Sequence, residues 1–171
     1  MTRSVLLGCC TMFVIITSPL AAQGGRQRVT KGSQTRGGAG AGVVCSYLTE
    51  DEVKPVLGSE LQPTFSTAGH CTWAAKSGGK QIVLITMRTA GEAAEHAFDY
   101  ALANPIKGAD KGVVQSGFGD KSFAMMLDRG VQIDVLKNKK MMQVQYLTGA
   151  HGTAADLEKL KPIATKAIAA Y

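Results

Sequence analysis

The chain has 171 residues, 45% of them hydrophobic and 19% charged, which predicts one globular domain with a buried core. Its formal net charge is +6 at pH 7. Five of the 19 lysines and arginines precede residue 43, in a segment without acidic residues, and the remainder carries 14 cations against 13 acids. Because the folded part is nearly neutral, a nucleic-acid partner is not expected.

Residues 1–22 have the pattern of an export signal. Arg3 supplies the positive start, Val5–Ile16 is largely apolar, and small residues that suit a cleavage site follow. The apolar run is too short for a convincing transmembrane helix. An uncleaved anchor and lipidation at Cys9, within a lipobox-like stretch, are the alternatives. We expect an exported protein that is periplasmic or secreted.

The segment 23–42 is rich in glycine, serine, threonine, glutamine and arginine, with Val29 as its one large apolar residue. Such a composition cannot bury enough apolar surface to offset the entropy lost on ordering. We predict a disordered, basic, glycine-rich linker. Its cations suit contact with an anionic membrane surface, with a merely soluble leader as the alternative. These cations are Arg26, Arg28, Lys31 and Arg36.

A single domain is predicted over residues 43–171. It begins with a short helix, because Thr49 and Glu52 have the spacing of a capping box and Gly58 suits the C-terminal cap. Residues 61–69 contain proline and glycine and are predicted to form a connection without regular structure.

The next segments predict a β-hairpin, in which residues 71–74 and 81–88 flank a glycine-rich turn. Because side chains alternate along a strand, Cys71 and Trp73 share a face that we expect to point into the core. His70 then points to the opposite face of the sheet.

A second hairpin is predicted around residues 138–140. Residues 131–135 and 142–146 alternate between apolar and polar side chains, which predicts one buried and one wet face. Residues 122–127 are apolar and are a further strand candidate. Residues 112–120 are predicted to form a turn and a short connector.

Two further helices are predicted from apolar residues at helical spacing, over residues 91–104 and 156–170. Pro162 lies inside the second span, so we expect a late start or a kink there. Since the strands come in hairpins, the fold class is α+β, with an antiparallel sheet of four to five strands and about three helices on one face. Cys45 and Cys71 remain after removal of the signal, and an even pair in an oxidising compartment predicts one disulfide.

The stretch Ser66–Cys71 reads STAGHC and is similar to the string that carries the catalytic histidine of chymotrypsin-like serine proteases. The serine motif of those enzymes, GDSGG, is absent, and the 101 residues after His70 contain two predicted helices, which does not suit a double β-barrel. His70 and Cys71 are neighbours on a strand and point to opposite faces, so they cannot form a nucleophile–base pair there. A hydrolase that combines His70 or His151 with Ser116 or Ser122 is retained as an alternative.

Glu92, Glu95, His96 and Asp99 lie together on a predicted helix and could bind a metal, but their i, i+4 spacing favours a solvated helix face. A phosphate-binding glycine loop is absent, so no metal or cofactor is predicted. The residues Gly117–Asp120 allow two interpretations: an exposed aromatic loop that contacts a ligand, or a structural turn with Phe118 packed on the sheet. The structural interpretation is favoured. We designate His70, Phe118 and Asp120 as candidate ligand contacts.

Two groups of residues carry a family resemblance. Cys45–Val53, Val56–Gly58 and Cys71–Trp73 give the pattern C-x-x-L-T-x-x-E-V, L-G and C-x-W, and Gly112–Phe123 contains a G-F-G-D-K-S-F segment. From Val43 to Tyr171 the chain thus resembles the exported bacterial proteins grouped as domain of unknown function 3558, many of them lipoproteins. The resemblance implies a small α+β domain whose first cysteine is pinned to the C-x-W strand. It implies no particular activity.

Because no catalytic set assembles, the sequence favours an exported cell-envelope domain that binds a protein or another envelope component without catalysis. Two alternatives remain open. The first is the small secreted hydrolase that uses His70. The second is an inhibitor or immunity-type protein that blocks an enzyme.

Overall fold

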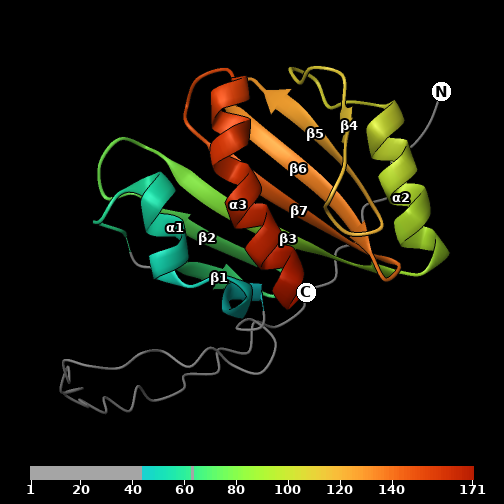
Figure 1. Ribbon diagram of the computed structural model, residues 1–171, viewed down its shortest axis with the longest axis horizontal. Helices are drawn as coiled ribbons and strands as arrows, with labels where there is room; N and C mark the ends of the chain where they lie inside the picture. Colours follow the sequence, from blue (N-terminus) through green and yellow to red (C-terminus); the bar gives the residue numbers. More distant parts are fainter. Residues whose placement is uncertain (1–43, 63) are drawn as a thin grey trace, which may run out of the picture. The chain divides into compact units, whose positions relative to one another are not determined.

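The computed structural model describes residues 44–62 and 64–171 (Figure 1). The predicted signal 1–22 and linker 23–42 lie outside these residues. In the described part of the chain, none of the helices is both long and apolar enough to cross a membrane.

Seven antiparallel strands form one sheet in the order β1-β2-β3-β7-β6-β5-β4. The elements, in chain order, are the 3₁₀ helix η1 (Val44–Tyr47), α1 (Glu50–Leu57), β1 (Phe65–Thr67), β2 (His70–Ala74), β3 (Gln81–Ala90), α2 (Glu92–Ala103), β4 (Val113–Gln115), β5 (Lys121–Leu127), β6 (Gly130–Lys137), β7 (Lys140–Leu147) and α3 (Ala154–Ala170). The α+β class and the disulfide are confirmed. The expected strand count of four to five was too low, because the three-residue strands β1 and β4 lie in segments predicted as connections.

Helices pack on both faces of the sheet, which corrects the expectation that all of them share one face. Along β5, Ala124 belongs to the core cluster that contains the apolar residues of α3 and α1, whereas Phe123 and Met125 belong to a second cluster with Phe98 of α2. Since neighbouring residues of a strand point to opposite faces, α2 and α3 lie on different sides. Figure 1 shows α3 crossing one face of the sheet.

The helix boundaries follow their capping residues. At the start of α1, the Glu52 carboxylate accepts hydrogen bonds from the Thr49 backbone N–H at 2.8 Å and from its hydroxyl at 3.1 Å. At the start of α3, the Thr153 hydroxyl accepts from the Asp156 N–H at 3.2 Å. Of the two alternatives expected for Pro162, the late start was wrong, since α3 begins at Ala154 and contains Pro162.

The disulfide ties η1 to β2. Cys45 and Cys71 are bonded, with their Cα atoms 5.2 Å apart. Cys71 is fully buried and Trp73, on the same face of β2, is 2% exposed. Both residues share a core cluster with Val53 and Leu57 of α1. The bond therefore holds η1 against the sheet in the same core cluster as Trp73, the largest of the fully buried side chains in the described residues.

Reduction of the Cys45–Cys71 bond should lower the free energy of unfolding by about 3 kcal/mol, because it releases a constraint on the unfolded chain. We expect urea denaturation to give a lower midpoint in reducing buffer than in oxidising buffer. The variant with both cysteines changed to alanine serves as the control, since reductant should not affect it. An unchanged midpoint of the wild-type protein after confirmed reduction would contradict this role.

The turn between β6 and β7 places two residues with side chains in the left-handed region, Asn138 at φ 50° and Lys139 at φ 58°. Two such residues in succession give the turn that matches the twist of a hairpin, and glycine is the preferred second residue. Lys139→Gly should therefore raise the free energy of unfolding, by about 0.5–1 kcal/mol. Lys139→Ala is the matched control, because alanine keeps the Cβ; equal stability of the two variants would refute the explanation.

Candidate functional site

β4 is one edge of the sheet and exposes apolar side chains. It pairs with β5 on one side and with no described strand on the other. Val113 is 63% exposed and Val114 is 70% exposed. Four of the five exposed large hydrophobic residues in the described chain lie between positions 100 and 114, and they are Tyr100, Ile106, Val113 and Val114. Apolar exposure is thus concentrated in the segment from α2 to β4.

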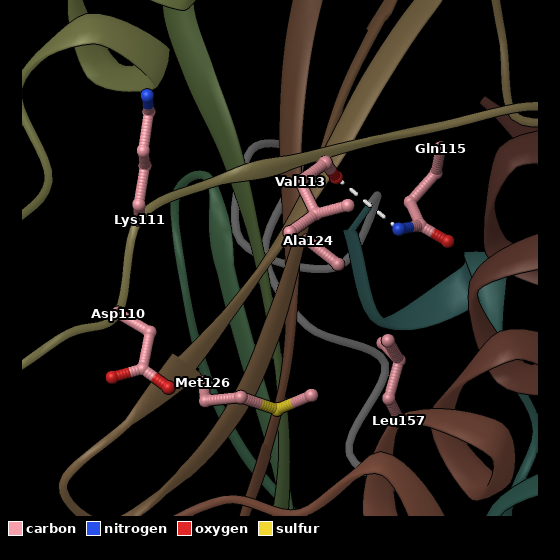
Figure 2. Close-up of a pocket in the computed structure, with 7 residues that line it drawn as sticks. All are labelled: Asp110, Lys111, Val113, Gln115, Ala124, Met126 and Leu157. Atoms are coloured by element: carbon pink, nitrogen blue, oxygen red, sulfur yellow. Dashed lines mark hydrogen bonds between the residues drawn. The ribbon is translucent and has the colours of Figure 1, made fainter.

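A cavity of about 320 Å³ lies on the α3 side of β4. Figure 2 shows the residues that line it. Its apolar wall is formed by Val113, by Ala124 and Met126 of β5, and by Leu157 of α3. Asp110 and Lys111 supply the charged groups. The wall of the cavity is thus largely apolar, and the Lys111 ammonium points away from it (Figure 2).

A second cavity, of about 340 Å³, lies on the α2 side of the same strand. Phe98 and Leu102 of α2 and Val114 of β4 form its apolar wall. Its polar lining consists of Asp99, Gln115, Asp120, Lys121 and Ser122. Two acidic residues and one lysine leave this cavity with an excess of negative charge.

Both cavities include Gln115, so β4 is the wall that separates them. The Gln115 side-chain amide donates to the Val113 carbonyl at 3.2 Å, and the Ser122 hydroxyl donates to the Gln115 carbonyl at 3.2 Å (Figure 2 shows the first bond). The first bond lies within β4, and the second adds to the backbone pairing that holds this three-residue strand on β5. An exposed apolar edge strand is therefore flanked by a hollow on each face of the sheet.

The segment before β4 is fixed at the far end of β5. Ala109 forms a β-bridge with Leu127, and the Asp110 N–H donates to the Met126 carbonyl at 2.9 Å. His151 Nε2 lies 3.6 Å from Asp110 Oδ2, and its Nδ1 lies 3.8 Å from Asp128 Oδ1. The side chains of Asp110, Asp128 and His151 are all exposed. Their contacts connect three loops beside the α3-side cavity.

A polar ladder crosses the α2-side face of β6 and β7. Gln132 and Gln143 both donate to the Asp134 carboxylate, the latter at 2.7 Å, and Gln145 donates to the Gln132 side-chain oxygen at 2.6 Å. Gln132 is 3% exposed and Asp134 is fully buried, although this face was expected to be wet. That expectation was wrong because α2 and its apolar cluster occupy the same face.

Burial raises the pKa of Asp134 to about 6, against the lowering effect of its two glutamine donors. No described lysine or arginine forms a salt bridge with it. The burial of Asp134 could not be predicted from the sequence pattern, because a polar residue in an alternating strand has the pattern of a solvent-facing position. Asp134 is a titratable element of the sheet, separate from the two cavities.

The candidate contacts Phe118 and Asp120 lie in the turn between β4 and β5. Phe118 is 9% exposed and belongs to the core cluster beneath α3. Asp120 lines the α2-side cavity, and its carboxylate accepts from the Asn138 N–H at 2.7 Å. Gly119 has φ +60°, and a Cβ there would lie 2.5 Å from the Leu136 carbonyl oxygen. In this turn the aromatic residue is thus buried, and Asp120 lies at the α2-side cavity.

His70 points away from the disulfide, since Cys71 is buried and His70 lies on the opposite face of β2. Its ring packs edge-on against Phe65 with centroids 5.9 Å apart, and its Nε2 lies 3.2 Å from the Thr72 hydroxyl. Phe65 itself is 58% exposed. His70 is therefore half-exposed near the β1 edge, at the opposite end of the strand order from β4.

The structure does not bring the proposed hydrolase residues together. His70 on β2 is four strand spacings from Ser122 on β5, or about 19 Å. His151 contacts loops beyond the other end of β5, about 17 Å along the strand from Ser122. Among the described residues, no group of three histidine, cysteine or acidic side chains is arranged to hold a metal ion.

Comparisons with protein-family models, curated proteins and solved structures gave no match to this chain. The candidate site is therefore defined by the geometry of β4 and its two cavities.

Asp134→Asn should stabilise the protein at pH 7.5, by about 1–3 kcal/mol, and have much less effect at pH 4.5. The folded-state pKa of Asp134 lies above its ordinary value of 3.8, so the acid contributes stability that is complete below about pH 4 and is lost as pH rises through about 6. Asparagine keeps a neutral group there at every pH. Urea denaturation of both proteins across this range measures the difference.

Asp128→Asn provides the control, because Asp128 has an exposed side chain. Its stability difference from the wild type should not show the same dependence on pH. A constant difference between Asp134→Asn and the wild type from pH 4.5 to 7.5 would contradict the raised pKa.

Proposed function

We propose that the domain is a non-enzymatic binding module that takes up an extended segment of a partner protein at the β4 edge. The supporting observation is the pair of exposed valines on an edge strand with a cavity on each side. The unpaired edge of a strand offers backbone N–H and C=O groups to an added strand, and pockets for alternate side chains supply specificity.

An extended polypeptide suits the site better than a small molecule. Each cavity alone is of modest size, but a strand added beside β4 points successive side chains to opposite faces of the sheet. One side chain then reaches the α2-side cavity and its neighbour reaches the α3-side cavity. Val113 and Val114, exposed in the free domain, become covered on opposite faces.

A stable homodimer through β4 is less well supported. β4 has three residues, and pairing it with a second copy buries little beyond the two valines of each chain. Stable protein interfaces bury about 1,200–2,000 Å² in total. A short segment whose side chains enter the two cavities contacts more of the domain for each residue of β4 that it pairs with.

We further propose that the protein acts in the cell envelope, periplasmic or secreted, and that it belongs with the exported bacterial proteins of domain of unknown function 3558. The disulfide favours an oxidising compartment, and the basic linker offers an additional contact with a membrane surface. If the partner is an enzyme, the same edge serves an inhibitor or immunity-type function. The hydrolase alternative draws no support from the separated serines and histidines.

A photoreactive amino acid in place of Val114 should crosslink to the partner in cells that produce the protein, because this side chain is 70% exposed beside the α2-side cavity. The same amino acid at Thr165, on the exposed side of α3, is the matched control. Mass spectrometry of the crosslinked peptides identifies both partners of each bond. Crosslinks confined to the Thr165 variant, or equal products at both positions, would argue against a docking edge at β4.

A further inference from the structure

We propose, building on the docking function above, that the segment bound at β4 carries a lysine or arginine next to an aliphatic residue. The cation enters the α2-side cavity and the aliphatic side chain enters the α3-side cavity. The inference rests on the different charge and lining of the two cavities.

The α2-side cavity has an apolar wall and an acidic border. Phe98, Leu102 and Val114 offer a surface for the methylene stem of a long side chain. Asp99 and Asp120 place two carboxylates at the same cavity, against one lysine, Lys121. A lysine or arginine matches both features, whereas glutamate meets an excess of like charge.

The two carboxylates keep capacity for an entering cation. Lys121 Nζ lies 3.3 Å from one oxygen of Asp99, in a pair whose side chains are 54% and 60% exposed. Asp120 accepts the Asn138 N–H through one oxygen. An ionised carboxylate has two oxygens and about four acceptor positions, so each can accept a further charged hydrogen bond.

The α3-side cavity selects a different side chain. Val113, Ala124, Met126 and Leu157 form an apolar wall, and its two charged residues, Asp110 and Lys111, have opposite signs. Because four of the seven residues that line this cavity are apolar, an aliphatic side chain gains most there by leaving water. Because adjacent residues of an extended segment point to opposite faces, the two determinants occupy consecutive positions.

Short peptides of about nine residues test this pattern. The probe peptide consists of threonines, except for an arginine followed by a leucine at its centre. Its N-terminus is acetylated and its C-terminus is amidated. Matched peptides carry glutamate or norleucine in place of arginine, or serine in place of leucine. Titration of the isotopically labelled full chain, followed by NMR, gives the dissociation constant and the residues that respond.

The arginine–leucine peptide should bind at least about tenfold more tightly than the glutamate–leucine peptide, with shifts at Val113–Gln115, and this preference should weaken at high salt. Asp99→Asn and Asp120→Asn should each reduce the preference, and Asp128→Asn, outside both cavities, should preserve it. The spectrum of each free variant verifies that the fold is intact.

The outcomes separate this inference from the docking function. Peptides that bind at β4 with equal affinity, whatever their charge, would overturn the proposed basic–aliphatic pattern and leave the docking function standing. If no peptide shifts β4 and Val114 gives no specific crosslink, both proposals fail. Shifts at β4 that depend only on protein concentration would identify a second copy as the occupant and overturn both.

Discussion

The sheet depends on the antiparallel pairing of β3 with β7, which joins two sets of strands that the chain builds separately. β1, β2 and β3 are consecutive neighbours, and so are β4 to β7. The joint runs from Gln81 opposite Leu147 to Thr86 opposite Met142. It brings together residues separated by about 60 positions, at an entropic cost that only burial of the combined core offsets. Once the two sets are joined, their first strands, β1 and β4, are necessarily the edges.

The single sheet that results from the β3–β7 pairing has two faces, and helices cover both of them. α3 and α1 pack with the fully buried Ile82, Val131 and Val144 on one face, and α2 packs with Phe123 and other apolar residues on the second. The polar ladder around Asp134 lies on this second face. Its carboxylate is held by two glutamine amides and by no described cation, so burial favours the neutral acid. The sheet therefore tolerates a carboxyl group near its centre in a form that depends on pH.

Local sequence signals predicted those parts of the fold that local chemistry determines. The capping residues Thr49 and Glu52 marked α1, alternation marked the β6–β7 hairpin, and the pairing of Cys45 with Cys71 was correctly predicted. Alternation alone could not tell which face is wet, because the position of α2 is a tertiary property. β1 and β4 escaped prediction because three residues are too few to show a period.

The candidate site was missed for the same reason. Val113 and Val114 are apolar neighbours within a glycine-containing segment, a pattern typical of a turn next to the core, and their exposure depends on where the sheet ends. His70 was singled out because of its neighbours in sequence, yet it lies on β2, next to the edge strand β1 and at the opposite end of the strand order from the cavities. Of the three candidate contacts, only Asp120 lines one of them.

An exposed apolar edge strand is ordinarily a hazard, since it offers a template for aggregation. Here β4 is short, and the Gln115 side chain bonds within it to the Val113 carbonyl, which limits how many residues of another chain can pair. The same shortness means that backbone pairing alone cannot hold a partner firmly. In the docking function proposed above, affinity must then come from side chains that fill the two cavities, and this requirement would make the edge selective. A protein with no use for β4 could have placed a charged residue at position 114, where the side chain is 70% exposed and valine contributes little to the core.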